Sequence, residues 1–221
     1  PTFKIEYMPG AGGMSGQNFA VNQAAKDGTA LFLPQDSSVV LQKLEPDTVK
    51  YDASTINWLG NVVQSTALLG IRKDTGVTKW EDLKDKEVFI ASSGAGSETD
   101  VYPRIANGVL GLKMNIIPGY TGGSSEGFVA LEKGEVGGIV AIWRTWSSRP
   151  DLNANIVHVL AFGNGREPNA PDVPNLLELI TNEDDIKLVR FISSIGPIGR
   201  ALAAHLLNGA HQSGDRIEPD A

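Results

Sequence analysis

The amino-acid sequence predicts an α/β fold with mostly parallel sheets. Short apolar runs typical of strands alternate with helical segments along most of the chain, and in this order helices usually cover a parallel sheet. Glycine-rich turns separate the segments, so the 25 glycines and 12 prolines indicate connections rather than disorder. With 221 residues and no fixed-period repeat, the chain is long enough for one large or two small domains.

The expected elements follow one another in a regular order. Alternating or continuous apolar residues predict strands at 3–8, 30–33, 57–63, 67–71, 87–91, 114–117, 136–142 and 156–162. Capping residues and glycines predict helices over about 14–25, at a short segment begun by Thr78 and Glu81, and in three segments that end near Leu110, Lys133 and Ser193.

Composition excludes several classes of function. The formal net charge is −7, and no basic cluster is present to bind the phosphates of nucleic acid. The chain has no cysteine, which excludes structural zinc fingers, thiol redox chemistry and disulfides. No apolar run is long enough to insert into a membrane, and no signal peptide is recognisable. We therefore expect no cofactor, no metal and no nucleic-acid partner.

Three Gly/Ser loops carry the functional prediction. Residues 9–15, 92–97 and 119–125 each follow a predicted strand and precede a helix. Ligands of open α/β sheets bind beyond the carboxyl ends of the strands. Helix starts offer unpaired N–H groups, glycine lets the backbone approach, and serine adds a hydroxyl. Each loop alone is an ordinary turn, but three together indicate an anion site, suited to a carboxylate.

More specific motifs do not match. A dinucleotide fingerprint would need glycine at position 15, where Ser15 stands, and no P-loop Gly-Lys-Ser/Thr is present. Residues 123–127 match the G-x-S-x-G elbow of hydrolases, with Ser125 as nucleophile and His158 as base. However, Pro118 and Gly119 end the preceding strand too early, and His158 lies inside a strand pattern. A serine hydrolase is therefore the alternative, and we expect no enzyme.

Five segments of the chain resemble, in the same order, the tripartite tricarboxylate transporter receptors, also called Bug or TctC-like solute-binding proteins. They are PGAGG at 9–13, IASSGAGS at 90–97, PGYTGGS at 118–124, LEKGEV at 131–136 and PDVP at 171–174. The resemblance covers about residues 1–204. It does not include the first strand–helix unit of the family or its C-terminal helices.

The resemblance implies a type II periplasmic-binding-protein-like fold, with two α/β lobes joined by crossing hinge strands. Lobe one would comprise 1–76 plus 194–204 and would be incomplete, lobe two would comprise 77–193, and 205–221 would be a disordered or foreign tail. The implied function is a periplasmic receptor, expected to be a monomer, that closes on a di- or tricarboxylate or a related acid. It would present this ligand to membrane transporter subunits.

Ligand contacts are also implied by position in the family. They would be Ser93, Gly94, Ser97, Tyr120, Gly122 and Gly123 in lobe two, and Gln35, Asp36 and Ser37 in lobe one. The family's lysine is replaced by Thr121, and two of its aspartates by Gly137 and Ala141. Without those aspartates, an amino-acid ligand would lack a partner for its ammonium group. A receptor fragment that no longer binds is a further alternative.

Overall fold

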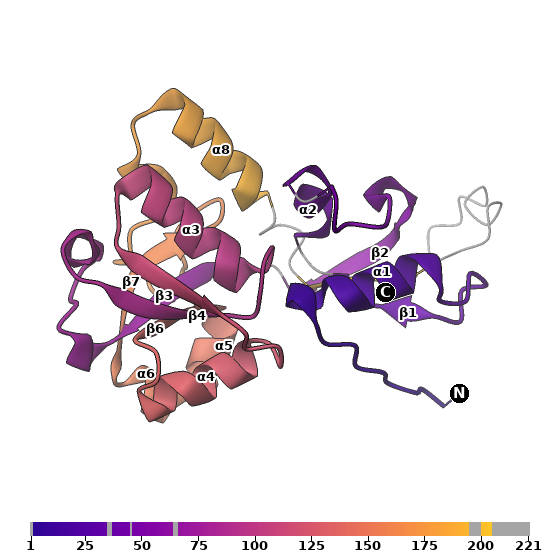
Figure 1. Ribbon diagram of the computed structural model, residues 1–221, viewed down its shortest axis with the longest axis horizontal. Helices are drawn as coiled ribbons and strands as arrows, with labels where there is room; N and C mark the ends of the chain where they lie inside the picture. Colours follow the sequence, from indigo (N-terminus) through magenta and orange to yellow (C-terminus); the bar gives the residue numbers. More distant parts are fainter. Residues whose placement is uncertain (1, 35–36, 45, 64–65, 195–199, 205–221) are drawn as a thin grey trace, which may run out of the picture.

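The computed structural model describes residues 2–34, 37–44, 46–63, 66–194 and 200–204, which contain two β-sheets (Figure 1). The smaller sheet has the order β1-β8-β2, and both of its pairings are antiparallel. Its strands are β1 (Leu31–Phe32), β8 (Arg200–Ala204) and β2 (Asn57–Val63). Together with α1 (Met14–Asn22) and α2 (Ser38–Leu44), this sheet is called the small lobe below.

The larger sheet has the order β5-β4-β6-β3-β7. Its strands are β3 (Ala67–Arg72), β4 (Val88–Ser92), β5 (Met114–Pro118), β6 (Gly138–Ile142) and β7 (Ile156–Phe162). Four of the five run in the same direction, and β3 runs against them. The large lobe is this sheet with α3 (Glu98–Leu110), α4 (Ser124–Lys133), α5 (Trp143–Ser147), α6 (Pro150–Asn153), α7 (Leu176–Leu179) and α8 (Glu183–Ser193).

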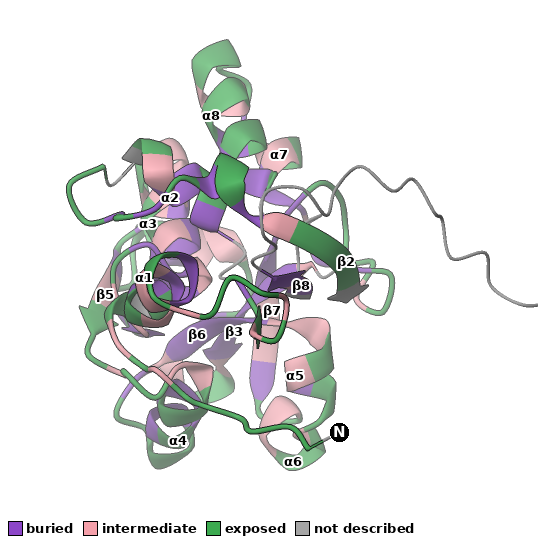
Figure 2. Ribbon diagram, turned by 90° about the vertical axis from the view of Figure 1, so that its right-hand side faces the viewer, coloured by how far each residue is buried: buried purple, intermediate pink, exposed green. Residues whose placement is uncertain are grey.

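The large lobe has three layers, because alternate residues of each strand face opposite sides of the sheet. On β3, Leu69 and Ile71 pack in a core cluster with α3 and α8, whereas Leu68 packs in a second cluster with α4 and α5. Figure 1 shows α3 and α8 on one side of the sheet and α4 to α6 on the other. Figure 2 shows that the central strands are buried between these helices.

The predicted α/β class is confirmed, and the mostly parallel arrangement is that of the larger sheet. One predicted strand is wrong: residues 3–8 have no regular secondary structure. Their apolar side chains Phe3, Ile5 and Tyr7 are 74–86% exposed. Alternation predicts a strand only where another strand pairs with it, and no strand in the described part of the chain pairs with this segment.

Two helix starts differ from the capping boxes that Thr78 with Glu81 and Ser97 with Asp100 suggest in the sequence. In a capping box, a Ser or Thr side chain and an acidic side chain three residues later each accept a backbone N–H. At the short helix Trp80–Lys84, Asp82 rather than Glu81 accepts the backbone N–H of Thr78, at 2.8 Å. The hydroxyl of Thr78 donates to the same carboxylate oxygen at 2.9 Å, and the two hydrogen bonds lower the pKa of the Asp82 carboxyl. At α3, Ser97 occupies the N-cap position but makes no side-chain cap bond. Helices α2, α5, α6 and α7 and strand β8 were not predicted.

The division into lobes at residues 76 and 194 stays a prediction. Strand membership would move the first boundary to the connection between β2 and β3, because β3 lies in the larger sheet. The connections between the lobes pass through 64–65 and 195–199, so the predicted hinge lies largely outside the described residues, as does the predicted tail at 205–221. No helix in the described part of the chain is long and apolar enough to cross a membrane.

Candidate functional site

Two of the predicted loops lie at the same edge of the large sheet. Strands β4 and β5 are parallel neighbours, and their last residues, Ser92 and Pro118, are partners in the register. The loops at 92–97 and 119–125 therefore start side by side, and the backbone N–H of Tyr120 donates to the carbonyl of Ser92 at 3.3 Å. The fold thus brings together the two loops that carry the six ligand contacts predicted for the second lobe.

The loop at 92–97 is held in shape by its own hydroxyl groups. The N–H of Ser93 donates to Thr99 Oγ1 at 2.9 Å, and the N–H of Gly94 donates to Ser92 Oγ at 3.1 Å. Ser97 Oγ donates to the carbonyl of Gly94 at 2.7 Å. The amides of Ser93 and Gly94, which were predicted to hold the ligand, therefore already have acceptors within the protein.

Two other amides of the same loop remain available. Among the described residues, the N–H groups of Ala95 and Thr99 have no acceptor. Thr99 lies in the first turn of α3, where unpaired N–H groups and the helix dipole favour an anion. The amides of this loop and helix start that have no acceptor among the described residues are therefore those of Ala95 and Thr99, rather than those of Ser93 and Gly94.

A buried carboxylate, paired with an arginine, bonds the first residue of this loop. Asp100 is 4% exposed and accepts the Ser92 hydroxyl at 3.2 Å. Arg104, one turn further along α3, donates to both oxygens of Asp100 at 2.9 and 3.0 Å, and these bonds raise the pKa of the guanidinium. An unpaired Asp100 would repel an anion at the start of α3, and Arg104 offsets that repulsion. This pair was not predicted from the sequence.

Removing the charge of Asp100 should loosen the loop. We expect Asp100→Asn to lower the free energy of unfolding by about 1–2 kcal/mol, since the amide keeps only one of the two oxygens that accept from Arg104 and carries no charge in this buried place. Urea denaturation measures the change. The control is Asp184→Asn, in the exposed pair with Lys187, which should change stability by less than about 0.5 kcal/mol. Equal effects of the two variants would contradict the structural role of Asp100.

The loop at 119–125 carries a negative charge of its own. Glu126 folds back over Gly122, so a Cβ atom on Gly122 would lie 2.5 Å from Glu126 Oε1. No salt bridge joins Glu126 to a cation among the described residues. Gly122 was predicted to contact a carboxylate, but a carboxylate of the protein already lies against it. The Glu126 carboxylate therefore makes the 119–125 loop electrostatically less favourable for an anion than the 92–97 loop.

The small lobe reaches this edge through Ser37. Its side chain is 1% exposed, and Oγ donates to the carbonyl of Gly96 at 2.9 Å. The structure therefore brings Ser37 to the 92–97 loop, as a partner of the loop's backbone. Gln35 and Asp36, the other contacts predicted in lobe one, lie outside the described residues.

The third predicted loop, at 9–15, is not part of this edge of the sheet. It follows no strand, because residues 3–8 form none. The carbonyl of Gly10 accepts the N–H of Gly13 at 2.9 Å in a 3-10 turn that leads into α1. Of the three loops, two therefore follow strands as predicted.

Comparison with known proteins identifies the fold. No family model and no curated protein matches the sequence. Among solved structures, the chain is similar to the periplasmic binding protein BugD, with a TM-score of 0.69 and 18% identity over 89% of this chain and 63% of BugD. It is also similar to MatC from Rhodopseudomonas palustris with bound malate, with a TM-score of 0.64 and 19% identity over 88% of this chain and 64% of MatC. A third neighbour, from R. palustris with adipate, has a TM-score of 0.64 and 18% identity, over 84% of this chain and 68% of that protein.

The chain has the fold of these periplasmic binding proteins. The resemblance seen in the sequence and the structural neighbours thus agree on the same fold. The chain spans less than two thirds of the length of BugD and of MatC.

The hydrolase alternative finds no support in this periplasmic-binding-protein fold. His158 Nε2 is 2.7 Å from Asn153 Oδ1, and its buried Nδ1 has no hydrogen-bond partner. Burial lowers the pKa of His158 to about 4. A general base must reach the hydroxyl that it activates, and neither nitrogen of His158 bonds Ser125. Within the described residues, no group of three or more acidic or histidine side chains could hold a metal ion.

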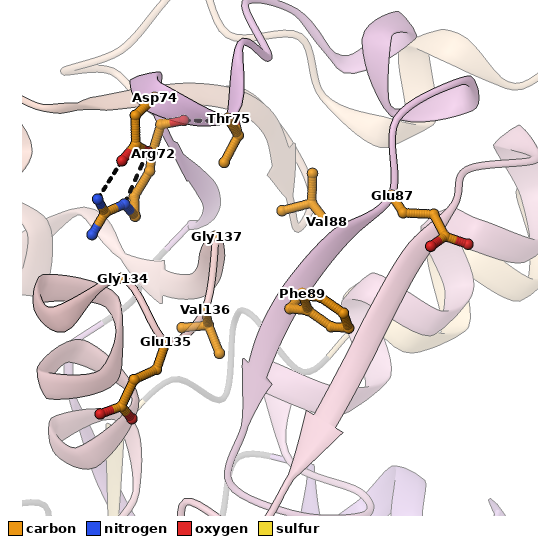
Figure 3. A pocket seen from close by; sticks show the side chains of 10 residues that line it. All are labelled: Arg72, Asp74, Thr75, Glu87, Val88, Phe89, Gly134, Glu135, Val136 and Gly137. Atoms are coloured by element: carbon orange, nitrogen blue, oxygen red, sulfur yellow. Dashed lines mark hydrogen bonds and ion pairs between the residues drawn. The ribbon is translucent and has the colours of Figure 1, made fainter.

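A hollow on the large lobe lies away from the candidate site. It is lined by the amino end of β4 and the turn before β6, with Arg72 paired to Asp74 on one side (Figure 3). Arg72 also donates to the carbonyl of Leu131 at 2.6 Å, so its guanidinium is engaged by the end of α4. Because the 92–97 loop follows the carboxyl end of β4, this hollow lies at the opposite end of that strand.

Proposed function

We propose that the chain is an extracytoplasmic solute receptor that binds a small carboxylate. The observation that supports this most directly is the meeting of two Gly/Ser loops at one edge of the large sheet, with the free amides of Ala95 and Thr99 at the start of α3. Helix-start amides bind carboxylates without an arginine. Neighbours of the same fold were solved with malate and with adipate, which favours a di- or tricarboxylate or a related acid.

Two further parts of the proposal rest on the resemblance to Bug and TctC-like receptors. The protein would work in the periplasm as a monomer and would present its ligand to the membrane subunits of a tripartite tricarboxylate-type transporter. The predicted contacts Ser93, Gly94, Ser97 and Tyr120 would shape the pocket, and Ala95 and Thr99 would hold the carboxylate.

Thermal denaturation with a panel of small carboxylates tests the proposal. At a ligand concentration of 100 times Kd, we expect a stabilisation of about 2.7 kcal/mol, which raises Tm by about 5–10 °C for a protein of this size. The panel includes malate, adipate and citrate, each with its uncharged diamide or triamide as a control. The measurement is made on this chain and on any longer natural form of it.

A pair of variants locates the binding site. Ala95 is exposed, so Ala95→Asp and Ala95→Asn should both fold. Ala95→Asp places a negative charge beside the free amides and should abolish the Tm shift, whereas the similarly sized Ala95→Asn should keep most of it. If no carboxylate raises Tm, or if the amides raise it as much, the proposed function is wrong.

A further inference from the structure

Helix α2 belongs to the small lobe and also packs against the large lobe. Leu41 is 1% exposed and belongs to the core cluster of the small lobe, together with Met14, Tyr51 and Ala203. The preceding residue, Val40, is 2% exposed and belongs to the main core cluster of the large lobe. The hydroxyl of Tyr51 donates to the carbonyl of Ser38 at 3.0 Å, which fastens the start of α2 to the small lobe. Because α2 packs in the cores of both lobes, any change in the distance between the lobes must break contacts of this helix.

Two contacts, one from α2 and one from the residue directly before it, converge on one residue of the large lobe, Gly96. The first is the hydrogen bond from Ser37 Oγ to the carbonyl of Gly96, at 2.9 Å. The second is apolar: a Cβ atom on Gly96 would lie 2.5 and 2.9 Å from the two methyl groups of Leu41. The backbone of Gly96 also has a φ of +79°, a conformation that favours glycine. No other residue type would let α2 approach this loop so closely.

We infer that Ser37, Leu41 and Gly96 form an inter-lobe latch, which holds the two lobes together at the mouth of the candidate site before any ligand binds. Leu41 sets the distance between the lobes, and Gly96 permits that distance. Because Gly96 lies next to Ala95 and Ser97, the latch closes beside the amides that would hold the carboxylate. The coupling of the latch to ligand affinity rests on the proposed function, whereas its effect on the lobes does not.

The latch has a consequence for binding. A receptor binds its ligand with an apparent affinity reduced by the fraction of molecules that are not in the competent arrangement. Opening the latch should therefore weaken carboxylate binding even though no ligand contact has been changed. Substituting a glycine of the large lobe that does not contact α2 should leave carboxylate binding unchanged.

Distances between spin labels test the latch without a ligand. The chain contains no cysteine, so Lys26→Cys in the small lobe and Lys133→Cys in the large lobe can be labelled specifically, and both positions are exposed. We expect Gly96→Ala to move the distance distribution to longer values. The matched control is Gly111→Ala, which also has a positive φ, +67°, but has no atom within 4 Å of an added Cβ. Both variants strain the backbone, and only the first should separate the lobes.

A second substitution should reverse the effect. Leu41→Val removes the two methyl groups that an added Cβ would meet, so the double variant with Gly96→Ala should recover the shorter distance. If carboxylates bind at all, Gly96→Ala should raise Kd by about tenfold or more, and the double variant should restore it. An unchanged distance in Gly96→Ala, or an equal change in Gly111→Ala, would overturn the latch. Absence of carboxylate binding in every variant would overturn the proposed function and leave the distance measurement to decide the latch.

Discussion

Replacing Gly70 with alanine is expected to destabilise the protein by about 3 kcal/mol or more, because the added methyl group has no room. Gly70 lies in the middle of β3, between β6 and β7. A Cβ atom there would lie 2.6 Å from Cη2 of Trp146 and 2.8 Å from Cγ2 of Ile156. Real Cβ atoms do not approach other atoms so closely, so either the indole or the strand must move.

The indole of Trp146 cannot move away easily. It is fully buried, and its Nε1 is 3.4 Å from the carbonyl of Leu68. The rings of Phe128 and His158 meet it edge to face, each with its centroid 4.9 Å away. Each of these contacts would be strained if the indole shifted, so the cost of the added methyl group cannot be avoided by a local adjustment.

Thermal denaturation measures the effect of Gly70→Ala, which should lower Tm by about 6–12 °C. The control is Gly108→Ala in α3, where an added Cβ meets nothing within 4 Å and alanine should stabilise the helix by up to about 1 kcal/mol. Trp146→Phe removes the part of the indole that the methyl group meets, so the double variant should lose less stability than the sum of the single variants. Stability of Gly70→Ala within about 0.5 kcal/mol of the parent protein would refute the packing described here.

The sequence predicted the strands of the large lobe better than those of the small lobe. Residues 114–117 and 156–162 are strands as expected, because runs of apolar residues that are buried in a sheet are visible in the pattern. Residues 3–8 have an equally clear alternation but no partner strand among the described residues. Helix α2 was missed because it is short and contains the β-branched pair Val39 and Val40, and it depends on packing against both lobes.

The sequence predicted the two loops of the candidate site but not the side-chain contacts within them. The loops at 92–97 and 119–125 could be found because each follows a strand and contains Gly and Ser. The role of Thr99 as acceptor of the Ser93 amide and the position of Glu126 over Gly122 could not be predicted. Both depend on side-chain directions that only the folded backbone sets. In the sequence, Ser97 and Asp100 have the spacing of a capping box. In the structure, the Asp100 carboxylate instead accepts the Ser92 hydroxyl and pairs with Arg104.

The stability of the protein is expected to fall as the pH is lowered from about 6.5 to 4, and His158 is the reason. Its ring lies between Trp143 and Trp146, with centroids 5.9 and 4.9 Å away, and no carboxylate in the described part of the chain pairs with it. Nε2 can donate to Asn153 Oδ1, while Nδ1 is buried without an acceptor for the proton that it would gain. Burial therefore lowers the pKa of His158 from 6.5 to about 4.

The sign of the effect follows from proton binding. Above pH 6.5, His158 is neutral in the folded and in the unfolded chain, so it contributes no pH dependence. Between pH 6.5 and 4 the unfolded chain binds a proton that the folded chain does not, and the folded state loses stability as the pH falls. The loss is complete below the folded pKa. From the shift in pKa, and allowing for partial exposure of the ring, we expect a total loss of about 2–3 kcal/mol.

Urea denaturation at pH values between 7.5 and 4 measures this loss, and His158→Gln isolates the part that belongs to His158. Glutamine does not titrate, and its amide can still donate to Asn153. Carboxyl groups and the other histidines titrate in both proteins, so they cancel in the difference between them. We expect the two stability curves to converge as the pH falls towards 4, with the parent protein losing about 2–3 kcal/mol more than the variant. Parallel curves would mean that His158 has the same pKa in the folded and in the unfolded chain, and this would contradict the burial of Nδ1 without a hydrogen-bond partner.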